Sequence, residues 1–95
     1  MSKKILILLG HPDASGMCGK IATAYEHAAR SAGFDVDRLN LGDMRFDPIL
    51  HQGYRARQEL EPDLVRFQTL LNAADHFVIV HPVWWTGMPA LLKGL

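Results

Sequence analysis

The sequence predicts an α/β protein built on a doubly wound parallel sheet. Two short stretches, Lys4 to Leu9 and Phe77 to Val80, are almost entirely apolar, as expected for strands that are buried on both faces. Each stretch is followed by a loop that contains glycine and then by residues with helical spacing. A strand, a loop and a helix repeated in this order are typical of βαβ units.

Length and composition restrict the functional class. The 95 residues are enough for one small domain, and ten basic and ten acidic side chains cancel, which gives no electrostatic case for a nucleic-acid or anionic-membrane partner. The single cysteine, Cys18, excludes an internal disulfide framework and fits a reducing compartment. The apolar run after Lys3 and Lys4 is too short for the core of a signal peptide. We therefore expect a cytoplasmic protein without membrane insertion.

The first half of the chain predicts one complete strand-helix-strand unit. After the strand and a loop over residues 10–19, apolar residues recur with helical spacing from about Met17 to Ala32. Gly33 stands just past this helix, where a glycine commonly ends one. Residues 34–41 carry apolar side chains at Val36, Leu39 and Leu41 among polar ones, which predicts a short edge strand.

The second half predicts an excursion and then a second unit. Residues 42–62 show no periodicity and contain two glycines and two prolines, so they form a long connection of the kind that is functional or part of an interface. From Pro62, one helical face carries Leu64, Phe67, Leu71 and Ala74. The strand 77–80 follows. Pro89 then occupies the expected first position of a third helix, which begins with residues 90–93.

The loop that leaves the strand 77–80 is the first candidate binding site, because ligands of open α/β sheets bind beyond the carboxyl ends of the strands. Residues 82–87 include two tryptophans and a glycine. This composition suits a flat conjugated ring with backbone amides at its polar edge. The alternative is that Trp84 and Trp85 fill the core, which is the more common role for an isolated tryptophan pair.

The loop from Gly10 to Gly19 is the second candidate. It leads from a buried strand into a helix N-terminus, where free amides and the helix dipole favour an anion. Ser15 can add a hydroxyl, and His11 can donate a hydrogen bond to a phosphate oxygen. The loop is neither a Walker motif nor G-x-G-x-x-G. The alternative is that Asp13 or Ser15 only caps the helix.

The other reactive side chains indicate no further centre. Cys18 lies near a helix N-terminus, where thiol pKa values are lowered, but the sequence assigns it no partner base and a packing role fits it better. The five histidines lack the spacing of metal ligands, so we predict no metal. Ser15 is not set in the G-x-S-x-G pattern of a serine nucleophile.

Three segments carry a family resemblance. They are residues 5–22 with Gly-His-Pro, residues 39–50 with Phe-Asp-Pro-Ile-Leu, and residues 81–94, which follow the pattern Pro-x-x-Trp-x-(Gly/Ser)-x-Pro-Ala-x-Leu-Lys-Gly. Together they resemble the flavodoxin-like NAD(P)H:quinone oxidoreductases, which include DT-diaphorase, the drug-activity modulator and the potassium-efflux ancillary proteins. The resemblance implies a flavodoxin-like parallel sheet of order 2-1-3-4-5, of which this sequence supplies about the first three strands.

The resemblance also implies a cofactor site. The residues it places at the flavin phosphates are His11, Ser15, Gly16, Met17 and Cys18. The residues it places at the isoalloxazine ring, through backbone groups, are Pro82, Val83, Trp84, Trp85, Thr86 and Gly87. The family has Ser-Phe, or a similar pair, where this chain has Gly16 and Met17. Ser15 lies one position early, so backbone contacts are expected there more than a hydroxyl contact. The resemblance assigns no catalytic side chain.

The implied activity is hydride transfer from NAD(P)H through a flavin to a quinone-like small molecule. The expected cofactor is FAD, with FMN as the alternative, and the expected assembly is a homodimer. Two other functions stay open. One is a regulatory partner of a membrane transporter. The other is an electron-carrier flavodoxin, which the neutral net charge disfavours. We also expect residues 1–95 to be the truncated N-terminal part of one domain and to be inactive as an isolated monomer.

Overall fold

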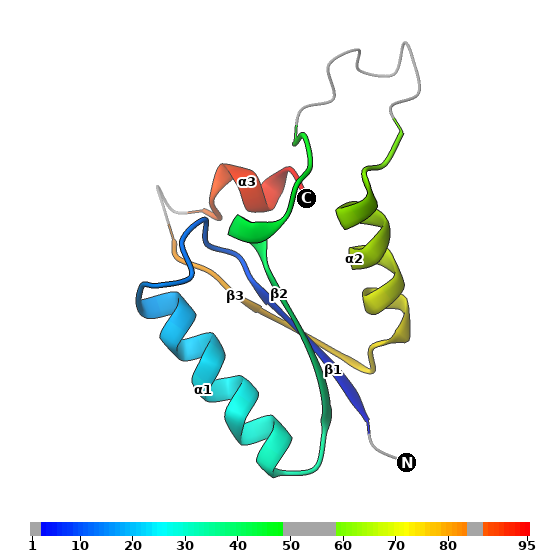
Figure 1. Ribbon diagram of the computed structural model, residues 1–95. Coiled ribbons are helices and arrows are strands. Elements are labelled where there is room, and N and C mark those ends of the chain that lie inside the picture. The colour runs from blue at the N-terminus through cyan, green and yellow to red at the C-terminus, as the bar shows by residue number, and fades with distance from the viewer. Residues whose placement is uncertain (1–2, 49–58, 84–86) are drawn as a thin grey trace.

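The computed structural model describes residues 3–48, 59–83 and 87–95 (Figure 1). Its elements are β1 (Lys4–Leu9), α1 (Met17–Ser31), β2 (Asp35–Asn40), the 3-10 helix η1 (Leu41–Asp43), α2 (Pro62–Ala73), β3 (His76–Val80) and α3 (Ala90–Lys93). The three strands form one parallel sheet in the order β2-β1-β3. The predicted α/β class and the parallel sheet are therefore confirmed.

Strand β1 is the buried centre of the sheet, and its side chains alternate between two apolar clusters. None of its residues from Ile5 to Leu9 is more than 6% exposed. Toward α1, the first cluster contains Ile5, Ile7, Leu9, Ala22, Ala29 and Val36. Toward α2 and α3, the second contains Leu6, Leu8, Leu39, Leu41 and Leu92. One helix thus covers one face of the sheet and two helices cover the other.

Helix α1 ends where the sequence predicts. The Gly33 N–H donates to the Arg30 carbonyl and the Phe34 N–H to the Ala29 carbonyl, both at 3.1 Å. This pair of bonds is the Schellman motif, which requires a left-handed residue. Gly33 supplies it with φ of +89°.

A polar clamp holds α1 against β2. Arg38 of β2 donates to Thr23 at 2.8 Å and to Glu26 at 3.1 Å. Arg30 donates to the other Glu26 oxygen at 3.0 Å and to the Val36 carbonyl at 3.0 Å. Burial opposes ionisation of Glu26, but the hydrogen bonds from Arg38 and Arg30 outweigh it and lower the pKa of this carboxyl.

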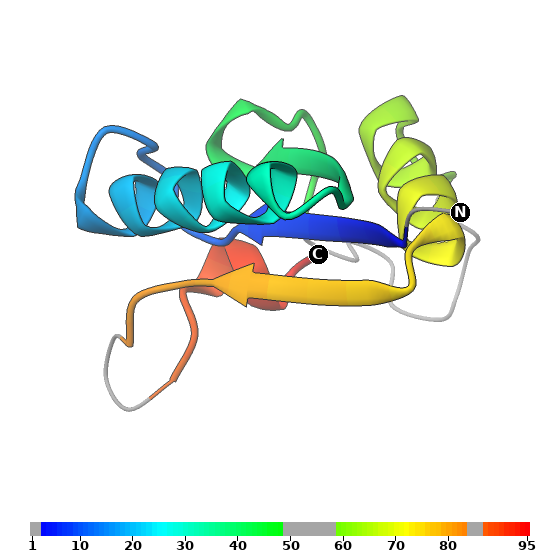
Figure 2. The ribbon, with the colours of Figure 1, turned by 90° about the horizontal axis from the view of Figure 1, so that it is seen from below.

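Strand β3 is more exposed than the sequence suggests. Its apolar run predicts burial on both faces, yet Phe77 is 37% and Ile79 42% exposed. Among the described residues, β3 pairs only with β1, and it lies along the outer side of the sheet (Figure 2). The expectation of two buried faces is wrong here because β3 is an edge strand in this structure.

The boundaries of other elements shift slightly. The predicted edge strand over 34–41 is present as Asp35–Asn40, and the chain then turns into η1. Pro89 is the N-cap of α3 rather than its first residue, and it is fully buried. Of the apolar face expected on α2, Phe67, Leu71 and Ala74 pack on the second cluster together with Leu70. Leu64 is half-buried but is not part of this cluster.

Candidate functional site

The two candidate loops begin side by side at the carboxyl edge of the sheet. The Gly10 N–H, just after β1, donates to the Val80 carbonyl at the end of β3 at a distance of 2.7 Å. A Cβ at Gly10 would lie 2.7 Å from Leu92 Cδ2 and 3.2 Å from His81 Cβ. Gly10 therefore sits tightly between the loop after β3 and α3. The sequence offers no clear signal for this contact, because it depends on strand pairing.

The loop after β1 is held by its own side chains. The Asp13 N–H donates to His11 Nδ1 at 2.8 Å. Ser15 donates its N–H and its hydroxyl to Asp13 Oδ1 at 2.9 and 2.6 Å. The Ser15 hydroxyl, and then its N–H, lower the pKa of Asp13. This role of Asp13 was missed from sequence, although Asp followed by Ser two residues later is a common turn signal.

The tautomer of His11 follows from this network. A ring nitrogen that accepts a hydrogen bond carries no proton, so the neutral ring of His11 has its proton on Nε2. The side chain is half-buried. His11 thus helps to hold the loop, and its contact with a phosphate stays a prediction.

The N-terminus of α1 is not capped by a side chain. Gly16 is the N-cap, and the first turn holds no acidic residue. The first helical bond runs from the Lys20 N–H to the Gly16 carbonyl at 3.1 Å, so the amides of residues 17–19 have no partner within the helix. The alternative in which Asp13 or Ser15 caps the helix is therefore wrong: these residues bond to each other.

Two glycines allow the loop to fold back on its neighbours. A Cβ at Gly19 would overlap the Ala14 carbonyl, and one at Gly42 would overlap the Pro12 carbonyl. A Cβ at Gly16, in contrast, would meet nothing within 4 Å. The loop is thus packed against α1 and η1, while space remains open beside the N-cap of α1.

The loop after β3 is described only in part. His81 Nδ1 lies 2.8 Å from the Pro82 carbonyl oxygen. Pro82 and Gly87 are half-buried, and Val83 is 70% exposed. Trp84, Trp85 and Thr86 lie outside the described residues, so both interpretations of the tryptophan pair stay predictions.

The remaining candidates differ in exposure. Cys18 is half-buried and packs against the first apolar cluster, which supports a packing role. Met17 is 72% exposed, so any contribution to an anion site comes from its backbone.

Among the described residues, no group of three or more histidine, cysteine, aspartate or glutamate side chains is placed to hold a metal ion. None of the helices in the described part of the chain has the length and apolar character needed to cross a membrane.

Comparison with known proteins shows similarity over almost the whole chain. Residues 3–95 match the family described as having a flavodoxin-like fold. The chain is 34% identical over 93 residues to an uncharacterized NAD(P)H oxidoreductase of Haemophilus influenzae, covering 94% of this chain and 46% of that protein. It is 27% identical over 112 residues to NAD(P)H dehydrogenase [quinone] 1 of Rattus norvegicus, covering 97% of this chain and 41% of that protein.

A solved structure supports the same relationship. The NAD(P)H:quinone oxidoreductase of Methanothermobacter marburgensis superposes with a TM-score of 0.81 at 26% identity, covering 99% of this chain and 51% of that one. The chain thus spans about half the length of the relatives that it matches.

Proposed function

The chain belongs to the family with a flavodoxin-like fold, and we propose that it forms part of an enzyme that uses a flavin to carry electrons from NAD(P)H to a quinone-like acceptor. Relatives named as NAD(P)H oxidoreductases and NAD(P)H:quinone oxidoreductases support the reaction class. The predicted family resemblance and the flavodoxin-like fold class are confirmed by the same similarities.

One observation carries the proposal: the loop that leads to the uncapped N-terminus of α1 and the loop after β3 start side by side at the same edge of the sheet. The hydrogen bond from Gly10 to Val80 joins the two loops. Free amides and the dipole of α1 favour the negative charge of a phosphate, and a strand end of an open α/β sheet is where such ligands bind. A phosphorylated cofactor with a ring therefore fits this edge.

The phosphate would be held mainly by backbone groups. The proposed donors are the amides of residues 16–18, with His11 as a further contact from the same loop. Ser15 contributes by holding Asp13, because its hydroxyl already donates to that carboxylate. The bonds from Ser15 lower the pKa of Asp13 and keep it ionised, so this carboxylate is not itself a partner for an anion.

The ring would lie against residues 82–87, with Trp85 as a wall of its pocket and backbone amides at its polar edge. A bound flavin supplies the hydride chemistry. The chain's own residues position the ring and exclude water from it.

The finer assignments are also proposals. FAD is the first choice and FMN the second, because the quinone-oxidoreductase relatives that the sequence resembles commonly use the dinucleotide. A cytoplasmic location is supported by the single cysteine, and the homodimer is inferred from the family resemblance.

The activity is tested in a chimera in which this chain replaces the matched part of the Haemophilus influenzae relative. We expect the purified chimera to retain flavin and to oxidise NADH or NADPH when a quinone is added. A chimera that holds flavin but does not oxidise either nucleotide would point instead to an electron carrier. Co-purification with a membrane transporter, without quinone reduction, would favour the regulatory role.

A further inference from the structure

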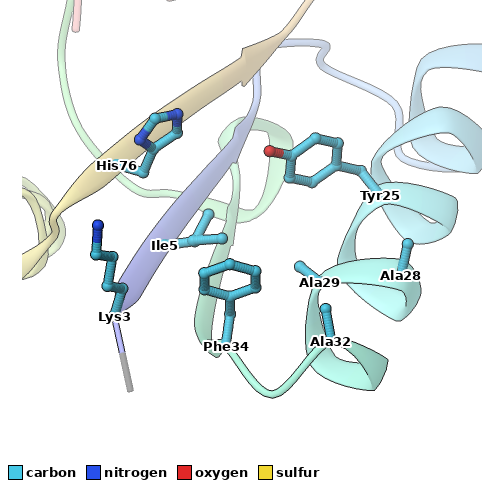
Figure 3. A pocket seen from close by; sticks show the side chains of 8 residues that line it. All are labelled: Lys3, Ile5, Tyr25, Ala28, Ala29, Ala32, Phe34 and His76. Carbon is cyan, nitrogen blue, oxygen red and sulfur yellow. The ribbon is translucent and has the colours of Figure 1, made fainter. Parts of the chain in front are cut away.

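Two histidines flank β3 and lie in different surroundings. His76 is the first residue of the strand and is exposed. It lies beside an apolar hollow of about 440 Å³ between α1 and the amino ends of β1 and β3 (Figure 3). His81 follows the last residue of the strand and is half-buried at the carboxyl edge. Within the described part of the chain, only the His81 side chain of this pair forms a hydrogen bond.

The hydrogen bond of His81 fixes a proton on its ring. Nδ1 lies 2.8 Å from the Pro82 carbonyl oxygen, and a carbonyl oxygen can only accept. Nδ1 therefore carries a proton, and in the neutral ring Nε2 carries none. His11 in the neighbouring loop has the reverse arrangement, because its Nδ1 accepts from the Asp13 N–H. The two histidines at this edge of the sheet thus differ in their tautomers.

The same bond orients the peptide group that joins Pro82 to Val83. The carbonyl of a trans peptide and the N–H of the following residue point in opposite directions, and the described residues contain no cis peptide. Since the Pro82 carbonyl accepts from the His81 ring, the Val83 N–H is directed away from that ring.

The Val83 N–H is a donor that makes no hydrogen bond within the described residues. Pro82 has no N–H, so Val83 supplies the first backbone donor of the loop after β3. Val83 is 70% exposed, which leaves room for a ligand beside it. This N–H is therefore available to an acceptor atom at the carboxyl edge.

The position of the His81 side chain is set by the elements around it. A Cβ at Gly10 would lie 3.2 Å from His81 Cβ and 2.7 Å from Leu92 Cδ2. The Gly10 N–H donates to the Val80 carbonyl, directly before His81. The end of β1 and helix α3 thus fix the base of the His81 side chain, so its bond to Pro82 is anchored to the sheet.

We propose that His81 is a positioning residue of the cofactor site: by holding the Pro82 carbonyl, it presents the Val83 N–H to an acceptor atom at the polar edge of a conjugated ring. This role rests on the proposed function, in which a ring lies against the loop after β3. Turned the other way, the same peptide would present its carbonyl, an acceptor, to that edge. The bond exists in the ligand-free chain, so the donor is oriented before a ring binds.

Two substitutions of similar size separate this role from packing. His81→Asn keeps an N–H donor as many bonds from Cβ as Nδ1, whereas His81→Leu places a methyl group there. Riboflavin, which has the ring without a phosphate, is the probe in the chimera. His81→Leu should weaken its binding by about tenfold, because one oriented hydrogen bond is lost, and His81→Asn by about threefold at most. Riboflavin should shift the Val83 amide signal in the unaltered chimera and in His81→Asn, but not in His81→Leu.

His76→Leu is the matched control, since it makes the same change at the other end of β3. It should leave the riboflavin affinity within about twofold of the unaltered chimera. The tautomers are measured without flavin, by nitrogen NMR spectra of the histidine rings at a pH where they are neutral. We expect the proton on Nδ1 of His81 and on Nε2 of His11.

A proton on Nε2 instead of Nδ1 of His81 would overturn the proposal before any ligand is added. Riboflavin affinity that is unchanged in both His81 variants, or lowered equally in both, would also overturn it, because the side chain would then only pack. Failure of the unaltered chimera to bind any flavin, with His81 protonated on Nδ1, would overturn the proposed function and this role with it.

Discussion

At Ser15, the hydroxyl donates to Asp13 Oδ1 at 2.6 Å, so it orders the loop and is not directed to a ligand. Ser15→Ala removes one neutral donor from an exposed pair. Because the hydroxyl only orders the loop, the flavin dissociation constant of the chimera should rise by roughly tenfold or less. Fluorescence titration measures it. A rise of several hundredfold would show that the hydroxyl contacts the cofactor directly.

Glu26 makes stability depend on pH. Hydrogen bonds from Arg38 and Arg30 outweigh the effect of burial and lower its pKa below the ordinary value of 4.5. A lowered folded-state pKa contributes stability above the unfolded value, and that contribution is lost as pH falls through the folded value. Glu26→Gln should therefore reduce stability at neutral pH by about 1 kcal/mol.

The pH dependence of Glu26→Gln gives the sharper test. Below about pH 4, the unfolding midpoints of Glu26→Gln and the unaltered chimera should converge, because the carboxyl is then being protonated. Asp37→Asn is the control, since Asp37 is exposed on β2 and lies outside the clamp. Thermal unfolding that shows a constant difference between pH 3 and pH 7 would contradict the role of the Glu26 charge.

Among the elements, α1 is stabilised by its C-terminal motif. Gly33 has φ of +89°, a conformation that costs an alanine about 1 kcal/mol. Gly33→Ala should lower the unfolding free energy of the chimera by about that amount without changing flavin affinity. Denaturant unfolding measures the first quantity, and no loss of stability would show that the Schellman motif is not formed.

The start of α1 allows a paired test of the loop. A Cβ at Gly19 would overlap the Ala14 carbonyl, whereas a Cβ at Gly16 would meet nothing within 4 Å. Gly19→Ala must therefore displace the loop, and we expect it to weaken flavin binding by about tenfold or more. Gly16→Ala should change it by about threefold at most. If the two variants bind flavin equally well, the loop is not part of the cofactor site.

Local signals explain which elements could be predicted. The uninterrupted apolar run predicts β1, and the glycine after α1 predicts where that helix ends. Both signals lie within a few residues of the structure they determine, so they can be read directly from the sequence. The exposure of β3 depends on what pairs beyond it, which the residues of 77–80 do not encode. The Gly10 contact with Val80 likewise joins residues that are far apart in the chain.

The same distinction holds for the candidate site. The sequence predicts that His11 lies in the loop and that residues 16–18 lie at the start of the helix, because a glycine-containing loop entering a helix has a recognisable pattern. The bond between Ser15 and Asp13 was not predicted. Ser15 was expected to contact a ligand or cap the helix and Asp13 to cap it, and neither was expected to bond to the other. The ring-binding loop stays a prediction at Trp84 and Trp85.

For the whole molecule, the central claim is that the carboxyl edge of the sheet binds a flavin through its phosphate. The most direct measurement compares FMN with riboflavin, which lacks the phosphate, by titration of the chimera and by amide NMR spectra. We expect FMN to bind roughly a hundredfold more tightly, because several charge-assisted hydrogen bonds are lost with the phosphate. FMN, and not riboflavin, should shift the amide signals of residues 16–18. Equal affinities with unchanged signals for these residues would contradict the account.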